Sequence, residues 1–169
     1  MNRDLNSTPV PHLDGETIFY AYTPEDKRPA TMVTKHDDRI ALINEIIGAK
    51  YIVIATQMWN WGPPSVLKAY VDQLVLPGTL DPYTQKHLAG KSFTILIASG
   101  GSYGHNPERD FLTGYLTFIG TQLGSDDVKA IRTEYTLAGV QPGLEHLIPK
   151  KEESFAIASA AAIERANAI

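Results

Sequence analysis

The chain has 169 residues, of which 43% are hydrophobic, and 15 basic against 19 acidic residues give it a net charge of −4. This length suffices for one hydrophobic core, so we expect a single domain over 1–169. Neither charge forms a block, which argues against nucleic acid and anionic membranes as partners. The sequence has no cysteine and no apolar run of signal-peptide or membrane-spanning length, so we expect a cytoplasmic protein without disulfides.

The first part of the chain, 1–33, is rich in Pro, Asp, Thr and Lys, and only its segment 17–22 (TIFYAY) is apolar. Such a composition is typical of irregular chain, so we expect 1–33 to form an extended arm on the surface of the domain. After it, isoleucines at three- and four-residue spacing predict a helix over about 36–48, with Thr34 and Asp37 as a capping pair.

Three later segments have the composition of β-strands. Two of them, YIVIAT (51–56) and SFTILIAS (92–99), are continuous runs of apolar and β-branched residues. Such runs predict strands that are buried on both faces, as in a parallel sheet. The third segment, VKAIRTEY (128–135), alternates in polarity and predicts a strand nearer the edge of the sheet.

Apolar residues at helical spacing separate and follow these strands. They predict helices over 66–75 and 111–119, and an alanine-rich segment predicts a last helix over 152–169. Strands that alternate with helices form a parallel sheet with helices on both faces. The expected fold class is therefore α/β with three core parallel strands. In such a sheet, ligands bind at the carboxyl ends of the strands. The loops at those ends are 57–64, 100–108 and 136–143.

The first of these loops, QMWNWGPP, contains both tryptophans of the chain. Trp59 and Trp61 offer flat apolar surfaces, and Asn60 between them offers both a hydrogen-bond donor and an acceptor. Together they suit a flat heteroaromatic ring such as a flavin, which needs stacking on its faces and hydrogen bonds at its edge. The alternative is that the tryptophans cap the sheet or fill a subunit interface.

The second loop, SGGSYGH, is rich in glycine, which allows its backbone to approach a ligand closely. Ser99, Ser102 and Tyr103 add hydroxyl groups to it. The alternative is an ordinary glycine-rich turn, because the segment does not lead directly into a helix as a dinucleotide-binding motif does. His105 is the one histidine in a predicted ligand-facing loop, where the alternative is plain solvent exposure. The other histidines lack metal-type spacing, so we expect no metal site.

Four stretches resemble the flavodoxin-like, FMN-dependent NAD(P)H quinone and azo-compound reductases, the azoreductase family. AKYIVIATQMWNWGPPSVLKAYVDQLV is similar to the family's strand, its Pro-Met-Tyr-Asn-Phe-type loop and the following helix. LAGKSFTILIASGGSYG resembles its Gly-Lys strand with a Gly-Gly-x-Tyr turn, and YLTFIGTQLG and RDLNSTPVPHLDGE resemble segments before its last strand and after its second strand. Gln57 stands where the family usually has proline, and tryptophans replace its usual Tyr and Phe.

This resemblance implies a homodimer that binds FMN at the strand ends and passes hydride from NAD(P)H through the flavin to a quinone or an azo compound. It places the flavin between two sets of residues. One set is Met58, Trp59, Asn60 and Trp61, and the other is Ser99, Gly100, Gly101 and Tyr103. We expect Trp61 and His105 to face the electron acceptor, and we assign no side chain as a catalytic acid.

Upstream, the resemblance predicts an N-terminally shortened fold. Family members begin with a strand, a serine-rich phosphate-binding loop, a helix and a second strand, whereas this sequence matches from the end of that second strand onward. We therefore expect an unpaired edge on the strand at 51–56, covered by 17–22 or by a partner chain, and no nest of N–H groups for the FMN phosphate. Two functions follow: an FMN-dependent oxidoreductase, or a non-catalytic, shortened flavodoxin-like binding domain that has lost the cofactor.

Overall fold

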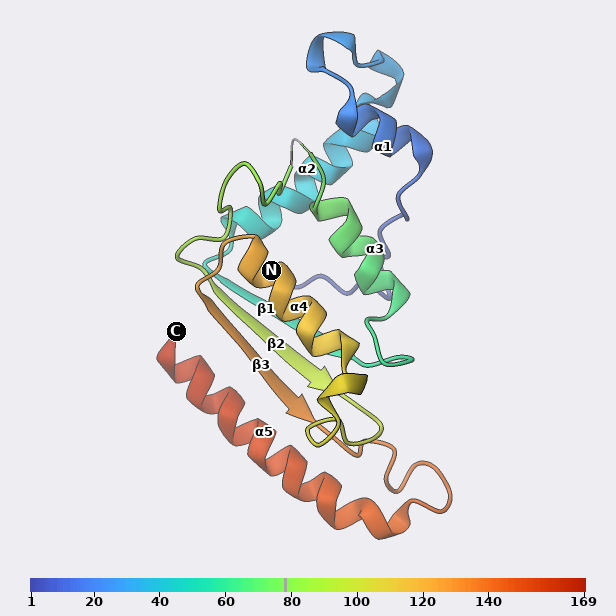
Figure 1. Ribbon diagram of the computed structural model, residues 1–169, viewed down its shortest axis with the longest axis vertical. Helices are drawn as coiled ribbons and strands as arrows, with labels where there is room; N and C mark the ends of the chain where they lie inside the picture. Colours follow the sequence, from blue (N-terminus) through green and yellow to red (C-terminus); the bar gives the residue numbers. More distant parts are fainter. Residues whose placement is uncertain (78) are drawn as a thin grey trace.

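The computed structural model describes residues 1–77 and 79–169, and it describes 32–35 by their backbone alone. Its centre is one parallel sheet with the strand order β1-β2-β3 (Figure 1). The strands pair in register from their first residue to their last. They are β1 (Tyr51–Gln57), β2 (Ser92–Ala98) and β3 (Asp127–Thr133). The three predicted strands are confirmed, and β3 lies at an edge of the sheet as predicted.

Helices pack on both faces of this sheet, as the sequence predicts (Figure 1). The longer ones are α2 (Val33–Gly48), α3 (Ser65–Leu74), α4 (Phe111–Gln122) and α5 (Ile148–Ala168). Single turns of 3-10 helix lie at Glu25–Lys27, Ala30–Met32, Pro107–Arg109 and Glu145–Leu147. The predicted capping contact of Thr34 involves a side chain outside the described residues. None of the described helices has both the length and the apolar character that a membrane crossing needs.

The face of the sheet under α2, α3 and α4 carries the main hydrophobic core. Ile52 of β1 and Phe93 and Ile95 of β2 point into it, together with leucines and isoleucines of the three helices. Gly120 of α4 permits close contact there, because a Cβ on it would lie 3.0 Å from Cδ1 of Phe93. Burial of these side chains is the main source of stability of the domain, and it fixes β2 at the centre of the sheet.

On the opposite face, α5 covers β3 but leaves β1 open. Arg165 anchors the end of α5, since its Nη1 donates to Oδ1 of Asp127 at 2.7 Å and its Nε donates to Oγ1 of Thr94 at 3.0 Å. A cavity of about 410 Å³ separates α5 from β1, and Val53 of β1 is 56% exposed. The prediction that 51–56 is buried on both faces is therefore wrong. Its physical reason is that α5 lies over β3, and no described strand pairs with the outer edge of β1.

The N-terminal segment is partly helical rather than extended. Helix α1 (Gly15–Tyr22) begins after Asp14, whose side chain caps the first turn by accepting a hydrogen bond from a backbone N–H group. Tyr20 is buried, and its ring centroid lies 5.0 Å from that of His36 in α2. The prediction of an extended arm is therefore wrong for 15–22, because a capped turn and a buried aromatic side chain stabilise a short helix there.

The open edge of β1 faces the first residues of the chain. Residues 1–6 run alongside β1 across a groove, whereas α1 lies by the far end of α2 (Figure 1). The expectation that 17–22 covers this edge is therefore wrong. Tyr20 of that segment contacts His36 of α2 instead, and its other large apolar side chains are exposed.

Candidate functional site

Three loops follow the three strands at one end of the sheet. Backbone hydrogen bonds tie them together: Met58 N donates to Ala98 O at 2.8 Å, Ser99 N to Thr133 O at 2.9 Å, and Thr136 N to Ser99 O at 3.0 Å. Because the strands are parallel and in register, their carboxyl ends meet at the same edge (Figure 1). The expected meeting of the three loops is confirmed.

The first loop contains a two-residue hairpin turn closed by Trp59 and Gly62. The backbone N–H group of each donates to the carbonyl of the other at 3.0 Å. The central residues, Asn60 and Trp61, have φ of 49° and 66°, the left-handed backbone that a type I′ turn requires at both positions. Asparagine adopts this conformation readily, whereas a bulky aromatic residue rarely does. Strain of this kind is concentrated at functional sites, which makes Trp61 a candidate for a role beyond folding.

Both indole rings of this turn lie at the surface. Trp59 is 60% exposed and Trp61 is 52% exposed, so neither serves as a buried cap of the sheet. The carbonyl of Trp61 accepts a hydrogen bond from Phe111 N at 3.1 Å, which ties the turn to the start of α4. The turn is thus preformed, and it presents two flat apolar surfaces to a ligand or to another chain.

The second loop starts at Ser99, which is almost completely buried. Its hydroxyl donates to the carbonyl of Gly101 at 3.0 Å, so this side chain stabilises the loop itself. A Cβ on Gly100 would lie 2.6 Å from Cδ1 of Leu137 in the third loop, and only glycine fits there without a shift of that side chain. Gly101 has more space, because its Cβ would lie 3.8 Å from Cε2 of Tyr103.

A carboxylate that the sequence motifs do not indicate binds this second loop. Glu134 directly follows β3 and accepts hydrogen bonds from Ser102 Oγ at 3.0 Å, Tyr103 N at 2.5 Å and Gly104 N at 2.7 Å. Burial raises the pKa of Glu134, but these three donors and the charge of Arg132 outweigh it, so the pKa lies below its usual value. The available signal was the position of Glu134, at the predicted ligand-binding end of a strand.

Arg132 connects this carboxylate to α4. Its guanidinium forms an ion pair with Asp110, and its Nη1 lies 3.6 Å from Oε1 of Glu134. Asp110 also caps α4, because Oδ1 accepts hydrogen bonds from Leu112 N at 3.1 Å and Thr113 N at 2.9 Å. One arginine therefore links the second loop, the last strand and the start of α4.

His105 lies in the second loop as predicted, and its side chain is exposed. Within the described part of the chain, no hydrogen bond or ion pair joins it to the tryptophan turn. The described residues also contain no group of histidines and carboxylates arranged to hold a metal ion. The structure thus brings together the two predicted sets of residues and leaves His105 at their periphery.

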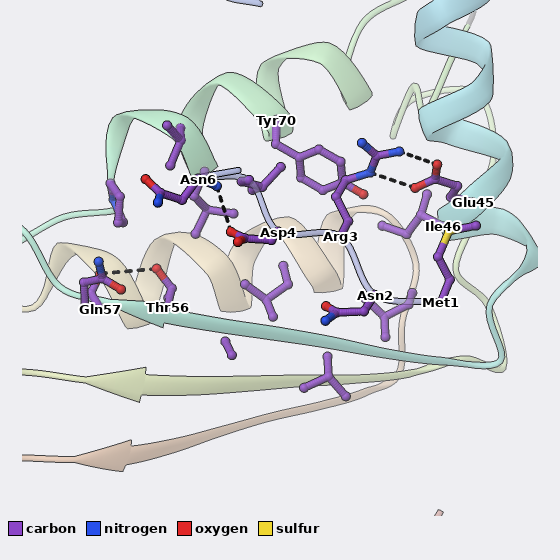
Figure 2. Close-up of a pocket in the computed structure, with 18 of the residues that line it drawn as sticks. Met1, Asn2, Arg3, Asp4, Asn6, Glu45, Ile46, Thr56, Gln57 and Tyr70 are labelled. Carbon is purple, nitrogen blue, oxygen red and sulfur yellow. Dashed lines mark hydrogen bonds and ion pairs between the residues drawn. The ribbon is translucent and has the colours of Figure 1, made fainter. Parts of the chain in front are cut away.

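A groove of about 710 Å³ runs along the open edge of β1 and reaches this site (Figure 2). One wall is β1, and the other includes residues 1–6 and the first turn of α3. Arg3 ties the N-terminal residues to α2, because its Nε donates to Oε2 of Glu45 at 2.9 Å. At the loop end, Gln57 and Trp59 line the groove, so it is continuous with the tryptophan turn.

The first and second loops offer backbone hydrogen-bond donors beside the exposed indole rings. Within the residues that the structure describes, the backbone N–H groups of Asn60, Trp61, Gly100 and Gly101 have no acceptor in the protein. Unpaired N–H groups next to exposed aromatic rings can bind the polar edge of a planar ring while its faces make apolar contacts. The site is therefore equipped for a planar, heteroaromatic ligand.

Known proteins are similar in sequence to nearly the whole chain. A family model described as "Flavodoxin-like fold" matches residues 1–155. An FMN-dependent NADH:quinone oxidoreductase of Frankia casuarinae is 35% identical over 98% of this chain and 81% of that protein. A protein of the same name from Frankia alni is 36% identical, again over 98% of this chain and 81% of that protein.

Solved structures of other proteins have the same fold as this chain. The crystal structure of an azoreductase from Bacillus anthracis str. Sterne has a TM-score of 0.82 and 20% identity, over 99% of this chain and 80% of that one. An FMN-dependent NADH-azoreductase from Bacillus anthracis str. Ames Ancestor, in complex with FMN, has a TM-score of 0.71 and 22% identity, over 95% of this chain and 80% of that one. These likenesses confirm the predicted fold class.

Proposed function

The chain belongs to the flavodoxin-like fold family, and from this membership we propose that it is an oxidoreductase that passes hydride from NAD(P)H through FMN to a quinone or azo compound. The name shared by the Frankia relatives supports FMN, NADH and a quinone, and the azoreductase structures support the azo compound. One observation carries the proposal: the tryptophan turn (59–62) and the diglycine loop (99–104) lie side by side at the carboxyl ends of neighbouring strands.

The residues of the two turns fit a flavin ring. Exposed indoles suit its apolar faces, and the unpaired N–H groups of the turns suit its pyrimidine edge. When bound, the flavin supplies the two-electron redox chemistry, so the chain has to bind and orient it and to leave one face open. Because the flavin carries out the redox step, we assign no side chain as a catalytic acid.

We assign the flavin contacts to the predicted residues. The first set is Met58, Trp59, Asn60 and Trp61, and the second is Ser99, Gly100, Gly101 and Tyr103. Ser99 acts through its hydrogen bond to Gly101 O, which shapes the turn. Trp61 and His105 face the electron acceptor, because both are exposed beside the site.

The visible absorption spectrum tests this proposal. Purified protein should retain a flavin spectrum after FMN is added and the unbound FMN is removed by desalting, and the complex should oxidise NADH in the presence of a quinone. A Trp59→Ala/Trp61→Ala variant, which removes both flat surfaces, should bind FMN less tightly and serves as the matched control. A parent protein that takes up no FMN at micromolar concentration would contradict the proposal.

A homodimer in the cytoplasm completes the proposed picture. We place the subunit contact around α4, where Phe111 and Phe118 are exposed and lie seven residues apart, on one side of the helix. Phe111 adjoins Trp61, so such a contact would border the flavin site. Light scattering should give twice the monomer mass for the parent and a lower mass for Phe118→Ser, and a monomeric parent would contradict the dimer.

The alternative function, a non-catalytic binding domain, has less support. The relatives that match nearly all of this chain are named as oxidoreductases. The two indoles are exposed, as a subunit interface also requires, so this alternative predicts that the Trp59→Ala/Trp61→Ala variant loses dimerisation while the parent never binds FMN. The two functions thus give opposite results in the same pair of proteins.

A further inference from the structure

We propose that Glu134 is a positioning residue for the flavin site: its carboxylate holds residues 102–104 in the conformation that keeps the diglycine loop beside the tryptophan turn. The inference rests on the proposed function, because that function assigns the loop to the flavin. It concerns a residue outside the set that the sequence motifs indicate.

The hydrogen bonds around Glu134 use both carboxylate oxygens. Oε1 accepts from the consecutive N–H groups of Tyr103 and Gly104, and Oε2 accepts from the hydroxyl of Ser102. Hydrogen bonds to a charged acceptor are stronger than neutral ones, and two consecutive N–H groups on one oxygen fix the path of the backbone. A segment rich in glycine has little other means of holding one conformation.

The carboxylate is itself held firmly. The Glu134 side chain is 17% exposed, and its backbone N–H donates to Oγ of Ser154 in α5 at 2.8 Å. The charged group that faces it is Arg132 of β3, which also pairs with Asp110 at the start of α4. Its contact with α5 is this backbone hydrogen bond, in which the neutral hydroxyl of Ser154 is the acceptor. The Glu134 side chain thus ties residues 102–104 to the end of β3 and, through Arg132, to the start of α4.

The charge state of Glu134 gives this role a pH signature. Protonation removes the negative charge and puts a proton on an oxygen that accepts the hydrogen bonds. The pKa of Glu134 in the folded chain is lowered from the usual 4.5, so its contribution is fully present above about pH 4.5 and is lost as the pH falls through the lower folded value. The loop should therefore loosen only in acid.

Glu134→Gln tests the proposal, because glutamine keeps the shape and one acceptor oxygen but lacks the charge. At pH 7 this variant should bind FMN about tenfold more weakly, as measured by quenching of tryptophan fluorescence. The amide protons of Tyr103 and Gly104 should exchange about tenfold faster in the FMN-free protein. Glu153→Gln, on the exposed side of α5, is the matched control and should leave both quantities unchanged.

The pH dependence separates positioning from a merely structural role. Parent protein should keep the protection of the Tyr103 and Gly104 amides, measured against the exchange rate of an unstructured chain at the same pH, down to about pH 4.5 and lose it below. Glu134→Gln should show weak protection throughout that range. If Glu134→Gln does not fold, Ser102→Ala removes one of the three hydrogen bonds and should weaken FMN binding about threefold.

Two results bear on the proposal in different ways. Parent-like exchange and parent-like FMN affinity in Glu134→Gln would overturn it. If the parent itself binds no FMN, the proposed function fails, and the exchange rates of the two amide protons alone then decide whether Glu134 positions the loop.

Discussion

The two loops that form the site are held in different ways. The tryptophan turn closes on itself through a pair of backbone hydrogen bonds, so its conformation depends mainly on neighbours in sequence, and one further bond from Phe111 N to Trp61 O ties it to α4. The diglycine loop has one local hydrogen bond, from Ser99 Oγ to Gly101 O, but residues 102–104 are held by Glu134, about thirty residues later in the chain, and by the arginine that faces this carboxylate. The conformation of the first loop therefore depends mostly on its own residues. The conformation of the second loop depends on the assembled sheet and on the charged groups of Glu134 and Arg132. Mutations in the two loops should accordingly have different effects.

The largest expected effect is on stability, from Arg132→Leu. This change leaves Asp110 and Glu134, both largely buried, without their shared cation. Removing one partner of a partly buried ion pair should cost about 2 kcal/mol in the free energy of unfolding, less than for a fully buried pair because some solvent reaches it. Denaturant unfolding measures it, and Arg109→Leu, at an exposed position, is the control. Parent-like stability of the Arg132→Leu variant would mean that the diglycine loop does not depend on this charge.

The next largest effect is on ligand binding, from Trp59→Ala. Loss of one stacking surface should weaken FMN binding by about 1.4 kcal/mol, or roughly tenfold. The free energy of unfolding should change little, because Trp59 is mostly exposed. Tyr83→Ala, at an exposed aromatic residue in another loop, controls for general loss of aromatic surface, and equal FMN affinities in the two variants would contradict the assignment of Trp59.

Features that depend on residues close together in the sequence are also the features that could be predicted from it. The strands and longer helices follow from β-branched runs and helical spacing, and the tryptophan turn follows from its place after a buried run. The position of Glu134 at the carboxyl end of a predicted strand indicates that it lies near the site, but its hydrogen bonds to the second loop could not be predicted, because nothing in a strand pattern tells which carboxylate turns back to an earlier loop. The exposed face of β1 could not be predicted for a related reason. An apolar run indicates that a strand favours burial, but whether it is buried depends on which elements pack against it in the folded chain.

A smaller effect on stability distinguishes the backbone strain at Trp61 from the contact that its indole makes with the ligand. Trp61→Gly should stabilise the fold relative to Trp61→Ala by about 1 kcal/mol, because glycine adopts the left-handed backbone without a steric penalty. Both variants lack the indole and should lose FMN affinity equally. Thermal unfolding and FMN titration of the pair measure the two contributions, and equal stabilities would show that the turn is not strained at this position.

The smallest effect contrasts two adjacent glycines of the diglycine loop. Gly100→Ala forces a shift of the Leu137 side chain and should cost about 1 kcal/mol. Gly101→Ala meets only an ordinary contact with Tyr103 and should change the free energy of unfolding by less than about 0.5 kcal/mol. Chemical denaturation distinguishes the variants, and a larger cost at Gly101 would contradict the close approach of the second and third loops.

The outer edge of β1 has a practical consequence for handling the protein. A strand edge with unpaired backbone groups is a surface through which chains aggregate, and exposed Val53 adds apolar area beside it. Concentrated solutions should therefore lose soluble protein through intermolecular strand pairing at β1. Val53→Lys places a charge on this surface and should raise the concentration at which turbidity begins.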